Sequence, residues 1–327
     1  MPFFGLRFDF RNPSFASVSM TERFNAGLEM TRWADERGFV VVVLSEHHGS
    51  DDGYLPSPLV MASAMAAVTR NIRIMVSAIV APLHDPLRLA EDAAVVDLIS
   101  GGRLDLVLAN GYVAAEFDMF GVALGVRAKR TTTAVGVLRK AWTGQPFIHE
   151  GREVRVSPAP DRVGGPAVSL GGSTEVAARR AARIADGFVP SVPEVWAYYR
   201  DERISLGHAD PGEYHGAGIA NFYLCDDVEQ GWRDVGQYFE HETNAYGRWM
   251  VDAGLAGMYE QVADVDDVRS RGMYRVLTPD LLLAEIAEQG PFAFVLMHPL
   301  LGGIPPSLGW RGLRLFEQDV LTRLPAV

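Results

Sequence analysis

The feature that most constrains this chain is a repeated alternation of short apolar segments with longer helical segments. Eight segments of strand length are each followed by a segment with apolar residues at helical spacing. Near-continuous apolar runs such as 39–44 are typical of parallel strands buried on both faces. The alternation predicts an α/β fold, with strands at 3–10, 39–44, 72–80, 104–109, 167–170, 187–190, 217–224 and 292–297.

A closed barrel explains this pattern better than an open sheet. A doubly wound dinucleotide-binding sheet would carry Gly-x-Gly-x-x-Gly after a strand, and the sequence has no such motif there. Segment 145–157 predicts an extra hairpin, and the helix at 228–251 is expected to break near 244–246. Segment 254–276 predicts an irregular stretch, a candidate for a mobile lid. We find no linker, so we predict a single (β/α)8 TIM-barrel domain with insertions over residues 1–327.

Composition restricts the classes of partner. The formal net charge of −11 disfavours nucleic acid and anionic membranes. A single cysteine, Cys225, excludes a disulfide framework and a Cys-rich zinc site within one chain. The N-terminal residues lack the pattern of a secretory signal, and no apolar run approaches the ~18 residues of a membrane span. We therefore expect a cytoplasmic protein with a small-molecule substrate.

The first candidate for chemistry is the triplet Glu46-His47-His48, directly after the second expected strand. The carboxyl ends of barrel strands form the catalytic face. An imidazole titrates near neutral pH, and an adjacent carboxylate can orient it, so His47 and Glu46 are the expected catalytic pair. Packing or loop roles are the alternative. A metal site is the less favoured interpretation, because adjacent residues of a strand point to opposite faces; we expect no metal.

The second candidate is an anion site at Gly171, Gly172, Ser173 and Thr174, where the fifth expected strand meets a helix. Glycines allow a ligand to approach the backbone, and free N–H groups at a helix start favour a phosphate. Plain helix capping by either hydroxyl is the alternative interpretation.

Two further strand ends carry candidate binding residues. Ser77 and Ala78 are small residues on the third strand, where a flat ring could lie against the backbone. Asn110, Gly111 and Tyr112 follow the fourth strand, and an amide there can bind a polar ring edge or a phosphate. Core packing and loop anchoring are the alternatives for these positions.

Taken together, these motifs resemble the bacterial luciferase-like family of flavin-dependent monooxygenases. The shared segments are the Glu-His-His triplet, HDPLRLAEDAAVVDLISGGRLDL, NGYVAAEF, the Gly-Gly-Ser-Thr helix start and the C-terminal LLGGIPPSLGWRGLRLFEQDVLTRL. The resemblance implies a barrel that binds reduced FMN, with His47 as acid/base, a cis peptide at Ser77-Ala78 and phosphate binding at Gly172 to Thr174. It also implies a homodimer and a transient flavin reductase as partner.

One departure from the family bears on the cofactor. Family members often carry a phosphate-binding arginine where this chain has Asn110, and a luciferase cysteine where it has Ala109. The leading hypothesis is a monooxygenase that uses reduced FMN and O2 on a small organic substrate. The alternatives are an F420-dependent hydride-transfer enzyme and a non-catalytic flavin-binding protein. A metal-dependent barrel hydrolase is the last alternative function.

Overall fold

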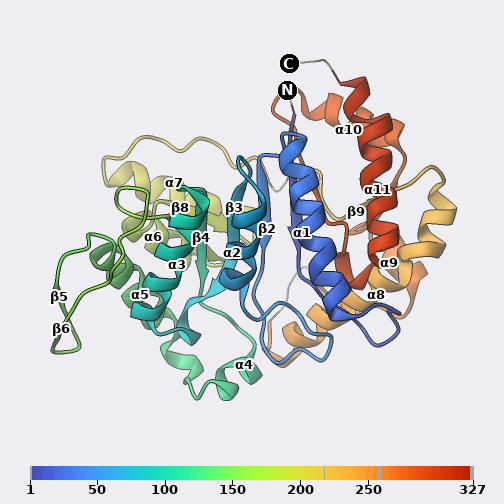
Figure 1. Cartoon of the computed structure of the whole chain (residues 1–327). Helices are drawn as coiled ribbons and strands as arrows, with labels where there is room; N and C mark the ends of the chain where they lie inside the picture. The colour runs from blue at the N-terminus through green and yellow to red at the C-terminus, as the bar shows by residue number, and fades with distance from the viewer. Residues whose placement is uncertain (1, 217, 256–258, 325–327) are drawn as a thin grey trace. The chain divides into compact units, whose positions relative to one another are not determined.

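The computed structural model describes residues 2–216, 218–255 and 259–324. The chain divides into two compact units. Unit 1 comprises Met1–Val43, His48–Pro56 and Ala217–Val327, and unit 2 comprises Leu44–His47 and Ser57–Gly216. Each unit is described by itself, with the element labels of Figure 1.

Unit 1 is built from both ends of the chain. Its strands lie in the order β11, β1, β2, and β1 pairs with β11 in parallel so that Phe3 faces Phe294 and Leu6 faces Met297. A second parallel pair joins β9 to β10. The elements are β1 (Phe3–Phe8), α1 (Met20–Glu36), β2 (Val41–Leu44), β9 (Phe222–Leu224), α8 (Val228–Asp252), α9 (Val265–Arg271), β10 (Arg275–Leu277), α10 (Pro279–Gln289), β11 (Phe294–Met297) and α11 (Pro306–Asp319).

Helices α1 and α11 run beside each other in unit 1, although most of the chain separates them (Figure 1). The Trp33 indole donates to Glu317 at 3.2 Å, and the Arg37 guanidinium pairs with the same carboxylate at 2.7 Å. The ring of Phe316 packs edge-on against Phe4 of β1 at 5.1 Å. Aromatic packing thus joins α11 to β1, and hydrogen bonds and an ion pair join α11 to α1.

Unit 2 carries four parallel strands in the order β3, β4, β7, β8. Because all four run the same way, their carboxyl ends lie at the same edge. The elements are α2 (Pro58–Val68), β3 (Arg73–Val80), α3 (Pro86–Ser100), β4 (Leu104–Ala109), α4 (Ala114–Met119), α5 (Arg127–Ala141), β5 (Phe147–His149), β6 (Arg152–Val154), β7 (Ala167–Gly172), α6 (Glu175–Ile184), β8 (Gly187–Pro190) and α7 (Trp196–Ser205).

Arg103 holds the amino-terminal side of unit 2 together. Its guanidinium donates to the carbonyl oxygens of Ser100, Ile72, Ala66 and Thr69 and to the Thr69 hydroxyl, at 2.6 to 3.2 Å. Ala66 and Ser100 lie in the last turns of α2 and α3, Thr69 is the C-cap residue of α2, and Ile72 directly precedes β3. Carbonyl oxygens in the last turn of a helix have no partner within that helix. One side chain therefore satisfies the ends of two helices at the start of β4.

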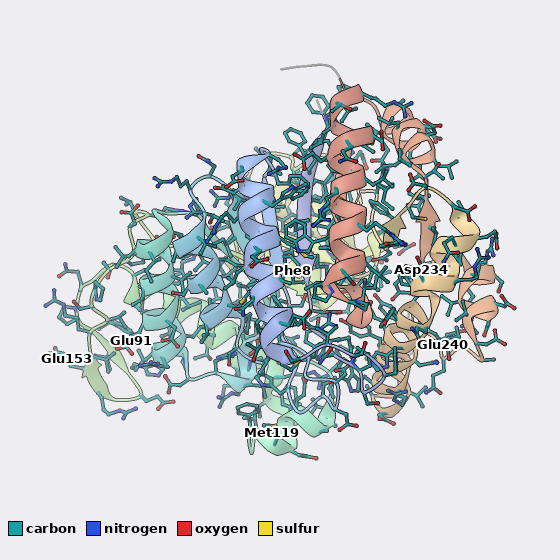
Figure 2. The ribbon with its side chains drawn as sticks, turned by 45° about the vertical axis from the view of Figure 1, so that its right-hand side comes forward. Phe8, Glu91, Met119, Glu153, Asp234 and Glu240 are labelled. Carbon is teal, nitrogen blue, oxygen red and sulfur yellow. The ribbon has the colours of Figure 1, made fainter. Side chains whose placement is uncertain are left out.

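The hairpin expected at 145–157 is present. Strands β5 and β6 pair in an antiparallel ladder, with Ile148 opposite Glu153. Ile148 is 63% exposed. Figure 2 places Glu153 on this hairpin, at the outer end of the ribbon that carries it.

Two expectations about the C-terminal half are wrong. Helix α8 runs unbroken through 244–246, because Tyr246 packs its ring on Trp249 and Asn244 caps the Val262 N–H. The segment 254–276 is not irregular throughout: Asp264 caps α9, and β10 follows. Residues 256–258 of that segment lie outside the described residues, and its role as a lid stays a prediction.

Candidate active site

Every residue of the predicted site belongs to unit 2, at or just after the carboxyl ends of its strands. Ser77 and Ala78 lie near the end of β3, and Asn110 to Tyr112 follow β4. Gly171 and Gly172 end β7, and Ser173 and Thr174 lead into α6. The parallel register of these strands brings three segments of the sequence to one edge.

His47 is fixed by a carboxylate that the sequence analysis did not select. Its Nδ1 lies 2.7 Å from Oε1 of Glu116, on the short helix α4. Glu116 is 1% exposed and His47 12% exposed by side chain. The Tyr112 ring meets the imidazole edge-on, with centroids 6.2 Å apart. A carboxylate that accepts from Nδ1 fixes the tautomer, so Nε2 is the nitrogen that can take up or release a proton.

Both carboxylate oxygens of Glu46, the second residue of the expected catalytic pair, have partners, and its catalytic role stays a prediction. Its Oε2 accepts the Val80 backbone N–H at 2.5 Å, and its Oε1 lies 2.7 Å from Nε2 of His84. The carboxylate is fully buried, so it ties the end of β3 to the loop that carries His47. Burial lowers the pKa of His84, but the hydrogen bond and charge of Glu46 outweigh this effect, and the net pKa is raised.

We expect His84→Asn to destabilise the chain in a pH-dependent way. A histidine whose folded pKa is raised stabilises the fold below its unfolded pKa of about 6.5, and this contribution is lost as pH rises through the folded value. The loss should be roughly 1–2 kcal/mol near pH 6 and should shrink at higher pH. Urea unfolding of both proteins at several pH values measures it. A pH-independent difference would contradict the ion pair.

The expected cis peptide is confirmed at Ser77-Ala78. Ser45 donates its hydroxyl to the Ser77 carbonyl at 2.9 Å, which links the loop of Glu46 and His47 to this strand. The register of β3 against β4 shifts between Ser77 and Ile79. Both residues of the cis bond are half-buried, as a surface for a flat ring requires.

Asn110 and Gly111 have the properties of a binding position. The Oδ1 atom of Asn110 is buried and has no hydrogen-bond partner among the described residues, which leaves an acceptor for a ligand to satisfy. Gly111 has φ +70°, and an added Cβ would lie 2.6 Å from Cγ1 of Val80. Only glycine therefore fits beside β3 at this point.

The Gly-Gly-Ser-Thr segment packs β7 against α6 and provides the N-cap of α6. A Cβ at Gly172 would lie 2.6 Å from Cβ of Ala177, so this glycine serves the contact between β7 and α6. Thr174 caps α6 by accepting the Ala177 N–H at 3.2 Å. Ser173 and Thr174 are exposed, and Gly171 is half-buried. The segment thus confirms helix capping, and the phosphate site stays a prediction.

Sequence reasoning missed two functional partners, Glu116 and His84. Glu116 is five residues beyond Gly111, and no apolar periodicity marks helix α4 as a separate element. The ion pair of His84 joins residues 38 positions apart, and only the fold brings them together. The glutamate within the shared segment NGYVAAEF was the one available signal.

Comparison with known proteins identifies the family. The model of the luciferase-like monooxygenase family matches residues 4–263. The chain is similar over 98% of its length to the crystal structure of monooxygenase RslO1 from Streptomyces bottropensis, with 27% identity, 99% of that chain covered and a TM-score of 0.78. The FMN complex of the oxygenating constituent of 3,6-diketocamphane monooxygenase from Pseudomonas putida has 20% identity, coverage of 99% of both chains and a TM-score of 0.71.

A curated relative is the oxygenase component of flavin-dependent trigonelline monooxygenase from Acinetobacter baylyi. It is 29% identical over 126 residues, which are 38% of this chain and 35% of that protein. The matched segments span about a third to two-fifths of the curated relatives' lengths. No helix in the described part of the chain has the length and apolar character needed to cross a membrane. The parallel strands and helices, with the match over most of the sequence, confirm the predicted luciferase-like (β/α)8 barrel, and the chain belongs to the luciferase-like monooxygenase family.

Proposed function

We propose that this chain is the oxygenase component of a two-component system, in which reduced FMN and O2 are used to insert one oxygen atom into a small organic substrate. A separate flavin reductase would supply the reduced cofactor through transient contact. The observation that carries the proposal is the His47–Glu116 pair, which places an oriented imidazole at the strand ends of a luciferase-like barrel.

The residues present in unit 2 fit a flavin. Asn110 offers a buried, unsatisfied oxygen, and Gly111 keeps side-chain bulk away from the end of β3. The backbone at Ser77 and Ala78 would support the ring, and Gly171 to Thr174 would hold the phosphate at the start of α6. Reduced FMN, when bound, supplies the two electrons that activate O2.

The chain's own residues would manage the proton and the geometry. His47 would hold or deliver a proton at Nε2, and Glu116 would keep the ring in the productive orientation. Glu46 would act as a positioning residue, because its two oxygens are committed to Val80 and His84. Tyr112 would shield one side of the imidazole from water.

The replacement of the family's arginine by Asn110 leaves one alternative to be tested, F420-dependent hydride transfer in place of FMN-dependent oxygenation. A single experiment tests both: the pure chain is titrated with reduced FMN and with reduced F420, and each complex is then exposed to air with candidate substrates. Oxygen-dependent product with FMN supports the proposal. Turnover only with F420, or tight FMN binding without turnover, would overturn it.

Substitution of Asn110 should tune cofactor affinity. Asn110→Arg supplies a cation for the FMN phosphate and should tighten binding about tenfold, as one added charge-assisted hydrogen bond implies. Asn110→Asp should weaken it by a similar factor. Quenching of FMN fluorescence measures both. Equal affinities in the two variants would show that this position does not face the phosphate.

Three hypotheses, on assembly, location and domain number, stay predictions. The homodimer is supported by apolar side chains that unit 2 leaves exposed on α2 and α3, namely Val60, Val95, Leu98 and Ile99. Cytoplasmic location is likewise a prediction, as is the assignment of the whole chain to one domain.

A further inference from the structure

A histidine and two carboxylates converge inside unit 1. Asp9 directly follows β1, whose last residue Phe8 is labelled in Figure 2, and His298 directly follows the end of β11 at Met297. Because β1 and β11 are neighbouring parallel strands, these two residues lie at the same carboxyl edge. Glu242 comes from α8. Ligand atoms of Asp9, Glu242 and His298 lie within 4.8 Å of one another, and the three residues are at most 4% exposed.

Glu242 is an unexpected residue at its position in α8. Helical spacing places it on one face with Tyr238, Phe239 and Tyr246, which are all buried. A carboxylate on such an apolar face is costly unless a partner satisfies it. The Oε2 atom of Glu242 is buried and has no hydrogen-bond partner within the described part of the chain. An ion or a bound water is the usual explanation for such an atom.

His298 brings a second buried atom of this kind to the cluster. Its Nε2 has no hydrogen-bond partner among the described residues and lies 3.7 Å from Oδ1 of Asp9, too far for a hydrogen bond. Two ligands bound about 2.1 Å from a tetrahedral ion are about 3.4 Å apart. An ion centred among atoms no more than 4.8 Å apart lies within about 2.8 Å of each, so inward shifts of under about 1 Å reach bonding distance.

Asp9 is oriented by the backbone around it. Its Oδ1 accepts the Arg11 N–H at 3.0 Å, and its Oδ2 accepts the Gly302 N–H at 3.4 Å. A carboxylate has about four lone-pair sites, so these two bonds leave capacity for an ion. Hydrogen bonds from outside a metal site orient its carboxylate ligands in this way.

Two arginines near the cluster weaken the case for a cation without removing it. Arg7 and Arg11 both act electrostatically on Glu242. Arg11 has its own partner, because its guanidinium donates to Asp52 at 2.5 Å, and Arg7 is only half-buried. The carboxylates of Asp9, Asp52 and Glu242 outnumber the two guanidinium groups, so one carboxylate lacks a counter-charge unless a proton or a cation joins it. A divalent ion together with two carboxylate ligands is neutral as a unit.

The donor set selects the kind of ion. An imidazole nitrogen favours transition metals, and carboxylate oxygens are ligands for both Zn²⁺ and Mn²⁺. We propose that unit 1 binds one divalent transition-metal ion, Zn²⁺ or Mn²⁺, through Asp9, Glu242 and His298. The ion joins the ends of β1 and β11 to α8, so its role is structural.

This inference goes beyond the proposed oxygenase function and does not depend on flavin. It also differs from a metal-dependent hydrolase, because the three ligands are buried. The ligands come from segments outside the Glu46-His47-His48 triplet, where the sequence led us to expect no metal.

Metal analysis by mass spectrometry tests the proposal. The chain is produced in medium supplemented with Zn²⁺ or with Mn²⁺ and dialysed, and a second portion is stripped with a chelator. We expect about one ion per chain after dialysis, and a melting temperature about 2–5 °C above that of the stripped chain. Glu242→Gln keeps the size of the side chain but loses its charge, so it should weaken metal binding about 100-fold or more in competition with the chelator. His298→Gln removes the imidazole and should weaken Zn²⁺ more than Mn²⁺.

The matched control is Glu240→Gln, on the same helix and labelled in Figure 2, where the glutamate is half-buried. It should retain the full metal content. A purely structural role for Glu242 predicts that Glu242→Gln melts below the stripped wild-type chain, whereas the proposal predicts that it loses only the rise caused by the metal. His298→Gln provides the same comparison if Glu242→Gln does not fold. A wild-type chain without metal, or equal metal binding by the wild type, Glu242→Gln and His298→Gln, would overturn the proposal.

Discussion

His47→Ala should reduce substrate oxygenation by about 10²- to 10⁴-fold, the usual contribution of a positioned acid or base, while FMN binding persists. The imidazole is held by Glu116 through Nδ1, so the substitution removes the proton carrier. The segment Gly171 to Thr174, which is the proposed phosphate site, and the Ser77-Ala78 backbone remain in place. Product formation, measured alongside flavin affinity, separates the two effects.

A control substitution of another histidine and a milder substitution of Glu116 show whether the loss of turnover is specific to His47. His208→Ala removes an exposed histidine of unit 2 and should leave turnover unchanged. Glu116→Gln retains the size of the partner but not its charge, so it should lower the rate less than His47→Ala. If His47→Ala turned over at the wild-type rate, the assignment of the acid/base would be wrong.

Arg103→Met should lower the free energy of unfolding by roughly 3 to 5 kcal/mol. The substitution removes five hydrogen bonds and leaves the carbonyl oxygens of Ala66, Thr69, Ile72 and Ser100 without this donor. Methionine preserves most of the apolar stem, so the loss reports the polar contacts. Urea unfolding followed by circular dichroism measures it.

Arg152→Met is the matched control for this prediction. Arg152 pairs with Glu150 on the hairpin, and both side chains are largely exposed. Exposed ion pairs contribute about 0.2–1 kcal/mol, so the variant should unfold close to the wild-type midpoint. Equal effects of the two substitutions would show that Arg103 does not secure the helix ends.

The barrel could be predicted because its strands carry a local signal. Strand β4 was predicted at its observed bounds, Leu104–Ala109, and β8 at Gly187–Pro190. A strand buried on both faces must be apolar throughout, and this requirement is visible in sequence. The missed elements β10 and α9 lack that requirement: β10 has three residues, and α9 exposes most of its surface.

The unbroken course of α8 shows the opposite case, in which long-range packing decides the outcome. Asn244 is a poor helix former, and its local tendency is to end a helix. In the fold it caps a segment 18 residues away in sequence, while Tyr246 stacks on Tyr259. Neither contact can be recognised from the spacing of apolar residues in 228–251.

The sequence indicated which candidate residues share one edge of the sheet, but not which side chains hydrogen-bond to them. The residues after each strand could be grouped, because parallel strands deliver their ends to one edge. The hydrogen bonds of Glu46 could not be predicted, since they depend on the path of the loop after β3.

The self-contained pairing of β5 with β6 has a consequence for how such chains diversify. The two strands form a ladder of their own, and no described strand outside the hairpin pairs with them. Insertions, deletions or a grafted peptide at Glu150-Gly151, both of which adopt positive φ, would leave the barrel ladder intact. We therefore expect the length and sequence of this turn to vary among relatives. The same turn is a practical position for attaching a fluorophore or an affinity tag.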